Sequence, residues 1–174
     1  MVHKKLLHKI ISLNEIRLEA IRQALRDIGR PDDSLGLHLF GIYAQCRDAN
    51  ITLFDDVLPM FERLSSKYTL GLLSNGNCYA EQLCLKDFFS FQVFSKDNSG
   101  VEKPDLRLFA VALQESKCRH EEFLHVGDSL KYDVVGARSA GVHVIWLNRN
   151  RAKGVVPYRT TAISSLHQLA ELLE

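Results

Sequence analysis

The chain has 174 residues, a net charge of +1, and 46% hydrophobic and 25% charged residues. This length fits one compact core with at most a small added subdomain, and the composition is that of an ordinary globular protein. Basic residues are scattered, and no apolar run approaches the roughly 20 residues of a membrane span. The sequence therefore predicts neither nucleic acid nor a membrane as a partner.

The cysteines give no sign of a metal site or a disulfide framework. None stands in a Cys-x-x-Cys pair or at zinc-finger spacing from a histidine; they are Cys46, Cys78, Cys84 and Cys118. Residues 1–10 are basic but lack the apolar stretch of a signal peptide. We interpret the chain as a cytoplasmic protein with reduced thiols.

The first third of the chain is predicted to be helical. Apolar residues recur at helical spacing over residues 6–28, as one helix or as two that meet near Ser12-Leu13-Asn14. Gly29-Arg30-Pro31 ends this stretch, and Asp32-Asp33-Ser34 offers cap residues for a helix over 35–47. A further helix is expected at 57–65.

After Lys67 short strands alternate with helices. Apolar runs at 69–73, 91–94, 123–126 and 142–147 are separated by helical patterns at 79–85, 105–115 and 131–140, and a helix at 166–173 closes the chain. This order predicts an α/β fold with a three-layer, Rossmann-like parallel sheet. We place the boundary near Asp55, with a helical region at 1–54 and the α/β core at 55–174.

Polar clusters follow the predicted strands, where the active sites of such sheets lie. In Gly127-Asp128-Ser129 and Asp133, two carboxylates five residues apart could point at one Mg²⁺ ion, which prefers oxygen ligands. The alternative is that Asp128 and Asp133 only cap the following helix. Taken alone, the motif leaves both interpretations open.

Two weaker signals precede it. Ser74-Asn75-Gly76 after a buried strand offers a hydroxyl, an amide and backbone N–H groups that suit phosphate oxygens, although a plain polar turn also explains it. Lys103 stands before a helix expected to begin at Pro104 and could neutralise phosphate, although an exposed structural lysine also explains it. Because all three signals share one order and one predicted crevice, together they favour a phosphate site.

This order of Ser-Asn, Lys-Pro and Gly-Asp-Ser-x-x-x-Asp resembles the second, third and fourth motifs of the haloacid dehalogenase-like (HAD) hydrolases, and within them the phosphatase-like branch. The resemblance covers residues 55–174, and residues 1–54 look like part of that family's helical cap. It implies substrate binding by Ser74, Asn75, Gly76 and Lys103, catalytic roles for Lys103 and Asp128, and Mg²⁺ bound by Asp128 and Asp133. The implied substrate is a phosphorylated small molecule.

The family's first motif, Asp-x-Asp, occurs nowhere in the chain. In the family its first Asp attacks phosphorus and its second is the general acid/base. Asp55-Asp56 lies after the cap region, and we interpret it as a structural linker. In the family fold the strand that carries the motif lies between the strands ending at Ser74 and Gly127, so we expect two unpaired strand edges inside the molecule. Loss of about five buried side chains would forfeit roughly 7–15 kcal/mol.

Two functions follow from these observations. The first is Mg²⁺-dependent phosphomonoester hydrolysis by a longer form, this chain being an inactive, shortened product. The second is a non-catalytic binding or regulatory protein on the same scaffold. A receiver-like signalling domain fits less well, because of the helical first third and the Ser-Asn turn. The sequence identifies neither the individual substrate nor the oligomeric state.

Overall fold

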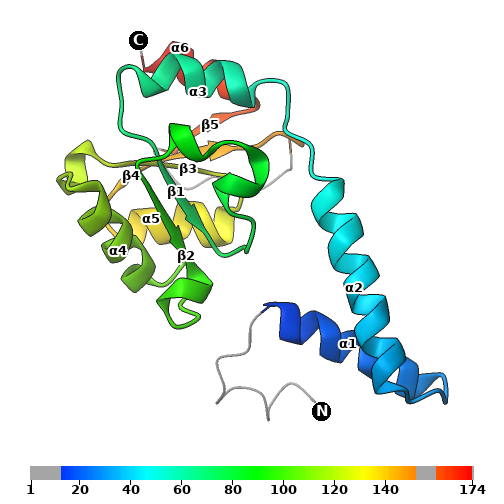
Figure 1. Ribbon diagram of the computed structural model, residues 1–174. Helices are drawn as coiled ribbons and strands as arrows, with labels where there is room; N and C mark the ends of the chain where they lie inside the picture. The colour runs from blue at the N-terminus through cyan, green and yellow to red at the C-terminus, as the bar shows by residue number, and fades with distance from the viewer. Residues whose placement is uncertain (1–12, 152–159, 174) are drawn as a thin grey trace. The chain divides into compact units, whose positions relative to one another are not determined.

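The described part of the chain forms two compact units, which divide between Thr52 and Leu53 (Figure 1). The structure is a computed structural model that describes residues 13–151 and 160–173. In the first unit, α1 (Leu13–Asp27) packs against α2 (Asp33–Ala49). Asp32 caps α2 as predicted, since its side chain accepts a hydrogen bond from Leu35 N at 2.9 Å. The part of the predicted first helix at 6–12 lies outside the described residues.

The second unit alternates helices with parallel strands. Its helices are α3 (Val57–Ser65), α4 (Leu106–Ser116), α5 (Val135–Ser139) and α6 (Leu166–Leu172). Its strands are β1 (Gly71–Ser74), β2 (Phe91–Phe94), β3 (Leu124–Gly127), β4 (His143–Leu147) and β5 (Thr161–Ile163). Within the described residues, no helix is long and apolar enough to cross a membrane.

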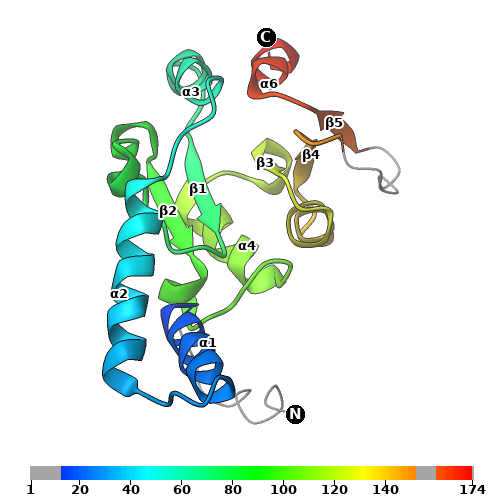
Figure 2. The same ribbon diagram turned by 90° about the vertical axis from the view of Figure 1, so that its right-hand side faces the viewer.

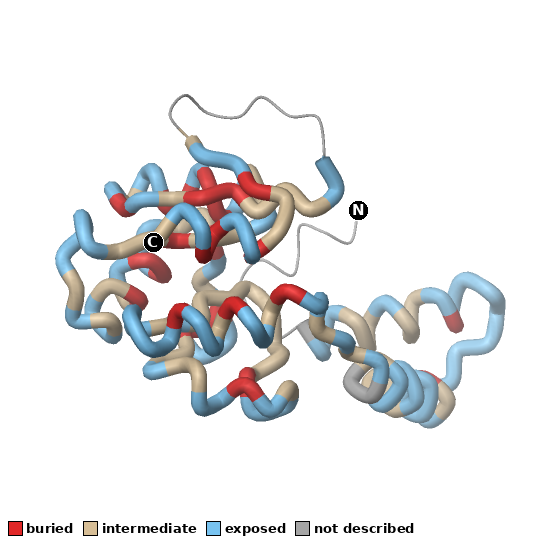
Figure 3. Tube along the Cα trace, turned by 90° about the horizontal axis from the view of Figure 1, so that it is seen from above, coloured by how far each residue is buried: buried red, intermediate tan, exposed pale blue. Residues whose placement is uncertain are grey.

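The helices cover the strands in two layers. α3 and α6 lie together on one side, and their apolar faces meet Ile145 and Ile163 of the sheet (Figure 1). α4 and α5 lie on the other side, where Phe109 and Ala137 are fully buried. Most of the buried positions, red in Figure 3, belong to the second unit. The predicted three-layer α/β architecture is confirmed.

The strands do not form one continuous sheet. β1 pairs with β2, and β3 pairs with β4, which in turn pairs with β5; all these pairings are parallel. Among the described residues, no strand is hydrogen-bonded to both β1 and β3. The two sheets are seen separately in Figure 2. The expectation of two unpaired strand edges is therefore confirmed for the described part of the chain.

Several predicted elements differ in the structure. The helix predicted at 79–85 is a short 3-10 turn, Ala80–Leu83, because Cys84 adopts a left-handed conformation at φ 56° and ends it. The helix predicted at 131–140 begins as a wider π turn, Leu130–Val134. The helix expected to begin at Pro104 begins at Leu106, since Asp105 is its cap. β5 is a strand that the sequence analysis did not predict.

Candidate functional site

A buried lysine–aspartate pair lies at the carboxyl ends of β1 and β3. Lys103 Nζ donates to Asp133 Oδ1 at 2.6 Å and to the carbonyl oxygen of Leu73, in β1, at 2.9 Å. Lys103 is only 8% exposed and Asp133 only 4%. Lys103 is thus not the exposed structural lysine of the alternative interpretation. An ammonium has three donors, so one N–H remains after these two bonds.

Asp133 is held by three groups. His125 Nε2 lies 2.9 Å from Asp133 Oδ1, and Ser129 N donates to Oδ2 at 2.9 Å. Because an ionised carboxylate only accepts, these bonds fit the histidine tautomer with its hydrogen on Nε2. Burial alone would raise the pKa of the Asp133 carboxyl, but the bond from His125 and the charge of Lys103 outweigh it. The pKa of Asp133 therefore lies well below its usual range, and the group is ionised.

Two glycines allow this close packing. A Cβ atom at Gly127 would lie 2.3 Å from Asp133 Cγ, so only glycine lets the carboxylate approach the end of β3. A Cβ atom at Gly136 would lie 2.6 Å from the ring of Phe109, on α4. The lack of a side chain at Gly136 therefore lets this turn pack closely on α4.

Asn75 holds the backbone on which Lys103 stands. Its side chain donates to the carbonyl oxygen of Lys103 at 3.0 Å and accepts from Lys103 N at 2.8 Å. Ser74 Oγ accepts from Gly76 N at 2.9 Å, which leaves the hydroxyl hydrogen as a possible donor to a ligand. The predicted phosphate-binding roles of Ser74, Asn75 and Gly76 stay predictions. The visible role of the Asn75 amide is to position Lys103.

Asp128 lies at the end of β3 with an exposed side chain. Its carbonyl oxygen accepts from Trp146 Nε1 at 2.9 Å, which fixes the loop. Asp133 has one acceptor position left, on Oδ2. Mg²⁺ usually takes one or two protein carboxylates together with water and phosphate oxygens. Asp128 fits such a role, whereas Asp133 could contribute only through Oδ2.

Residues 13–151 and 160–173 contain no group of three or more His, Cys, Asp or Glu side chains placed to hold a metal ion. The assignment of Mg²⁺ to Asp128 and Asp133 therefore stays a prediction. All four cysteines are free thiols, as the sequence analysis expects.

His125 is the member of this cluster that the sequence analysis missed. It lies within the apolar run of β3, its ring packs edge-on against Phe109 at 5.3 Å between centroids, and it is 7% exposed. A single histidine in a strand is usually a core residue. Only its position three residues before Asp128 could have indicated that it faces the site.

Asp56 is buried too, but elsewhere. Its carboxylate accepts two bonds of 2.8 Å from Arg149 and one of 2.7 Å from Leu166 N. The hydrogen bonds from Arg149 lower the pKa of Asp56, more than burial raises it. These bonds join the start of α3 to the start of α6, which confirms the structural interpretation of this residue.

Comparison with known proteins identifies relatives of this chain. The chain is 34% identical over 113 residues to pyrimidine 5'-nucleotidase YjjG of Escherichia coli, covering 60% of this chain and 49% of that protein. It is 31% identical over 143 residues to glyceraldehyde 3-phosphate phosphatase of Methanothermobacter thermautotrophicus, covering 75% and 63%. The chain thus spans less than two thirds of the length of these relatives.

The structure of 2-haloacid dehalogenase from Pseudomonas syringae pv. Tomato matches with a TM-score of 0.81 and 30% identity, over 99% of this chain and 75% of that one. The family model for haloacid dehalogenase-like hydrolases matches residues 3–141. The chain therefore belongs to the haloacid dehalogenase-like hydrolase family.

Proposed function

We propose that this chain provides the phosphate-binding half of a Mg²⁺-dependent phosphomonoester hydrolase of the cytoplasm. The supporting observation is the bonded cluster of Asn75, Lys103 and Asp133 at the carboxyl ends of β1 and β3. A buried cation with one N–H to spare, beside the Ser74 hydroxyl, suits a phosphate oxygen. The names of the two relatives above, a pyrimidine 5'-nucleotidase and a glyceraldehyde 3-phosphate phosphatase, point to phosphorylated small molecules, which supports the same substrate class here.

Each residue of the cluster has a distinct part in this proposal. Lys103 offsets the negative charge of the phosphate, and Asn75 and Asp133 hold the ammonium in place. Asp128 is the exposed carboxylate that would hold Mg²⁺, with the remaining position on Asp133 Oδ2. The bound ion would supply further positive charge at the phosphate oxygens.

The nucleophile is not among these residues. The 174-residue sequence contains no Asp-x-Asp, and the carboxylate of Asp133 is occupied by Lys103, His125 and Ser129. We therefore infer that hydrolysis needs a carboxylate from outside this sequence. The lack of Asp-x-Asp in this sequence also favours the second candidate, a binding or regulatory protein that holds phosphate without cleaving it.

Both candidate functions require phosphate binding, which titration calorimetry with inorganic phosphate and Mg²⁺ tests. We expect phosphate to bind the chain, and Lys103→Ala to weaken binding by about 10- to 100-fold, the range for a lost charge-assisted bond. Lys86→Ala, at an exposed lysine of the same unit, is the matched control. Equal affinities for the two variants would overturn the proposed site.

An assay with an aryl phosphate and Mg²⁺ separates the two candidates. We expect the 174-residue chain to show no turnover above that of Lys103→Ala. Turnover that disappears in Lys103→Ala and in Asp128→Ala would support the hydrolase and contradict the need for an external carboxylate.

A further inference from the structure

One oxygen of Asp133 is shared by two side chains from different parts of the fold. Lys103 Nζ, from the loop before α4, donates to Asp133 Oδ1 at 2.6 Å, and His125 Nε2, from β3, lies 2.9 Å from the same oxygen. All three side chains are at most 10% exposed. Each carboxylate oxygen has about two acceptor positions, so these two contacts fill Oδ1.

His125 is fixed both by the sheet and by the core. Its backbone pairs with Val144 of β4, and its ring meets the fully buried ring of Phe109 edge-on, at 5.3 Å between centroids. By contrast, the Ser129 N–H that bonds Asp133 Oδ2 belongs to the loop after β3. A donor on a packed strand keeps its direction more closely than a donor on a loop. His125 is therefore the more rigid of these two holds on the carboxylate.

The hydrogens of the Lys103 ammonium depend on this hold. Of its three N–H groups, one bonds Leu73 O and one bonds Asp133 Oδ1, which leaves the third for a ligand. Without His125, Oδ1 would have an open acceptor position in buried surroundings, and a buried acceptor without a partner is costly. The carboxylate could then tilt and take a second N–H from the same ammonium. The third donor would be spent on Asp133 instead of on a ligand.

The alternative role for His125 is to fill space in the core. Its edge-on contact with Phe109 suits that role. A residue that only fills space needs no polar atom, however, whereas His125 Nε2 lies at hydrogen-bond distance from a buried carboxylate. The two roles differ in one consequence, which is the response of the Lys103 ammonium when the N–H is removed and the apolar packing is kept.

We propose that His125 is a positioning residue of the phosphate site. Its Nε2–H fills the second acceptor position of Asp133 Oδ1 and thereby leaves the third N–H of Lys103 for a phosphate oxygen. In this role His125 acts through Asp133 and Lys103 and does not itself bond phosphate. The use of that N–H by phosphate rests on the proposed function, whereas the effect of His125 on the Lys103 ammonium does not.

Titration calorimetry with inorganic phosphate, without Mg²⁺, tests the proposal on the whole 174-residue chain. His125→Leu removes the N–H and keeps an apolar side chain, whereas His125→Gln keeps an N–H donor. His143→Leu makes the first change at an exposed histidine of the neighbouring strand β4 and is the matched control. We expect affinity to fall about 10-fold in His125→Leu, and to stay within about 3-fold in His125→Gln and within about 2-fold in His143→Leu.

A double-mutant cycle shows whether His125 acts through Lys103. In a Lys103→Ala background the third N–H is gone, so we expect His125→Leu to change phosphate affinity by less than about 2-fold. The same fold loss with and without Lys103 would mean that His125 affects phosphate by another route, and would overturn the proposal. Equal losses in His125→Leu and His125→Gln would show that only the shape of the ring matters, which also overturns it.

Nitrogen NMR gives a second measurement that needs no phosphate. In the unaltered chain at neutral pH, the ring signals of His125 should show a hydrogen on Nε2; a hydrogen on Nδ1 alone would overturn the proposal. The Nζ signal of Lys103 should shift in His125→Leu and keep its position in His125→Gln. Should His125→Leu fail to fold, the ring signals of the unaltered chain and the affinity of His125→Gln still decide.

The outcomes separate this proposal from the proposed function. If phosphate binding depends on Lys103 but is unchanged in His125→Leu, the role of His125 is overturned and the phosphate site stands. If the unaltered chain binds no phosphate, yet the Lys103 Nζ signal shifts in His125→Leu and not in His125→Gln, the proposed function fails and the effect of His125 on the ammonium stands. If neither affinity nor the Nζ signal responds to His125→Leu, His125 is only a core residue.

Discussion

Asp133 and Asp56 are both buried, both paired with a cation and both held below their usual pKa, yet they lie in different surroundings. Asp133 meets Lys103 and His125 at the ends of β1 and β3, and that ammonium keeps a donor for a ligand. Asp56 meets Arg149 and Leu166 N where α3 and α6 begin. Burial and ion pairing therefore do not separate a site from a scaffold. The two aspartates are distinguished instead by position, because Asp133 lies at the carboxyl ends of the strands beside an ammonium that keeps an unused N–H donor.

Among the variants that test this comparison, Lys103→Met should have the largest effect on stability. Removing one partner of a buried ion pair leaves the Asp133 charge poorly compensated, so we expect the free energy of unfolding to fall by about 3–5 kcal/mol. Urea unfolding measures the change, with Lys86→Met as the control at an exposed lysine. A loss below about 1 kcal/mol would mean that His125 and the Ser129 N–H suffice to hold Asp133.

Asp56→Asn should have the second largest effect on stability and leave the site intact. The bonds from Arg149 lose their charge assistance, so we expect a loss of about 2 kcal/mol in unfolding free energy. Phosphate affinity in the presence of Mg²⁺ should change less than about 2-fold when measured on the folded variant. A large loss of affinity would contradict the purely structural role of Asp56.

Acid should remove the stabilisation at both aspartates. Their folded pKa values lie below the value of about 3.9 in unfolded chains, so the stabilisation is present above about pH 4 and is lost as pH falls through the folded values. Each group changes the slope of stability against pH by at most about 1.4 kcal/mol per pH unit. Asp133→Asn should flatten this slope in urea unfolding between pH 5 and 2; an unchanged slope would contradict the shift.

Trp146→Phe should have the smallest effect. It removes the indole N–H that bonds the carbonyl oxygen of Asp128, so we expect about 1 kcal/mol of lost stability. Phosphate binding in the absence of Mg²⁺ should stay unchanged, whereas its enhancement by Mg²⁺ should weaken as the Asp128 loop loosens. Titration calorimetry with and without Mg²⁺ measures both, and an equal loss under the two conditions would argue against Asp128 as a metal ligand.

The sequence predicted the residues of the site better than their bonds. Ser74, Lys103 and Asp128 could be found because a polar cluster after an apolar run marks the end of a strand. Their partners could not, since the bond from Asn75 to the Lys103 backbone joins positions 28 residues apart. His125 remained hidden because one histidine in an apolar strand carries no periodic signal.

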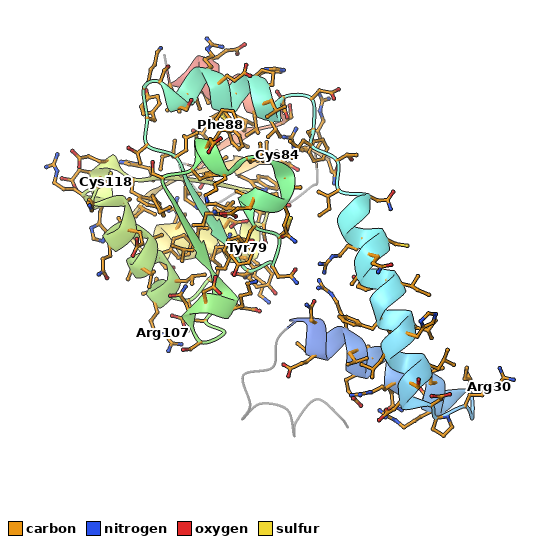
Figure 4. The ribbon with its side chains drawn as sticks, in the orientation of Figure 1. Arg30, Tyr79, Cys84, Phe88, Arg107 and Cys118 are labelled. Atoms are coloured by element: carbon orange, nitrogen blue, oxygen red, sulfur yellow. The ribbon has the colours of Figure 1, made fainter. Side chains whose placement is uncertain are left out.

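The local shape of some elements was also out of reach. The turn at Ala80–Leu83 reads as a helix by spacing, but the left-handed conformation of Cys84 ends it after four residues. Contacts with distant residues hold the turn in place. Ala80 N donates to the side chain of Gln92 on β2, and the hydroxyl of Tyr79, which is labelled in Figure 4, donates to Asp97. β5 has only three residues, of which Ile163 is buried, and is too short to show alternation. Tertiary contacts rather than propensity decide such short segments.

The split between the sheets has a consequence for folding. Residues 71–94 contain all of the β1–β2 sheet, and residues 124–163 contain all of the β3–β4–β5 sheet. Each half can assemble from an uninterrupted piece of chain, so its pairings close only short loops. The bonds of Lys103 to Leu73 and Asp133 join positions 30 residues apart, so we expect these contacts between the halves to form after the pairings within each half.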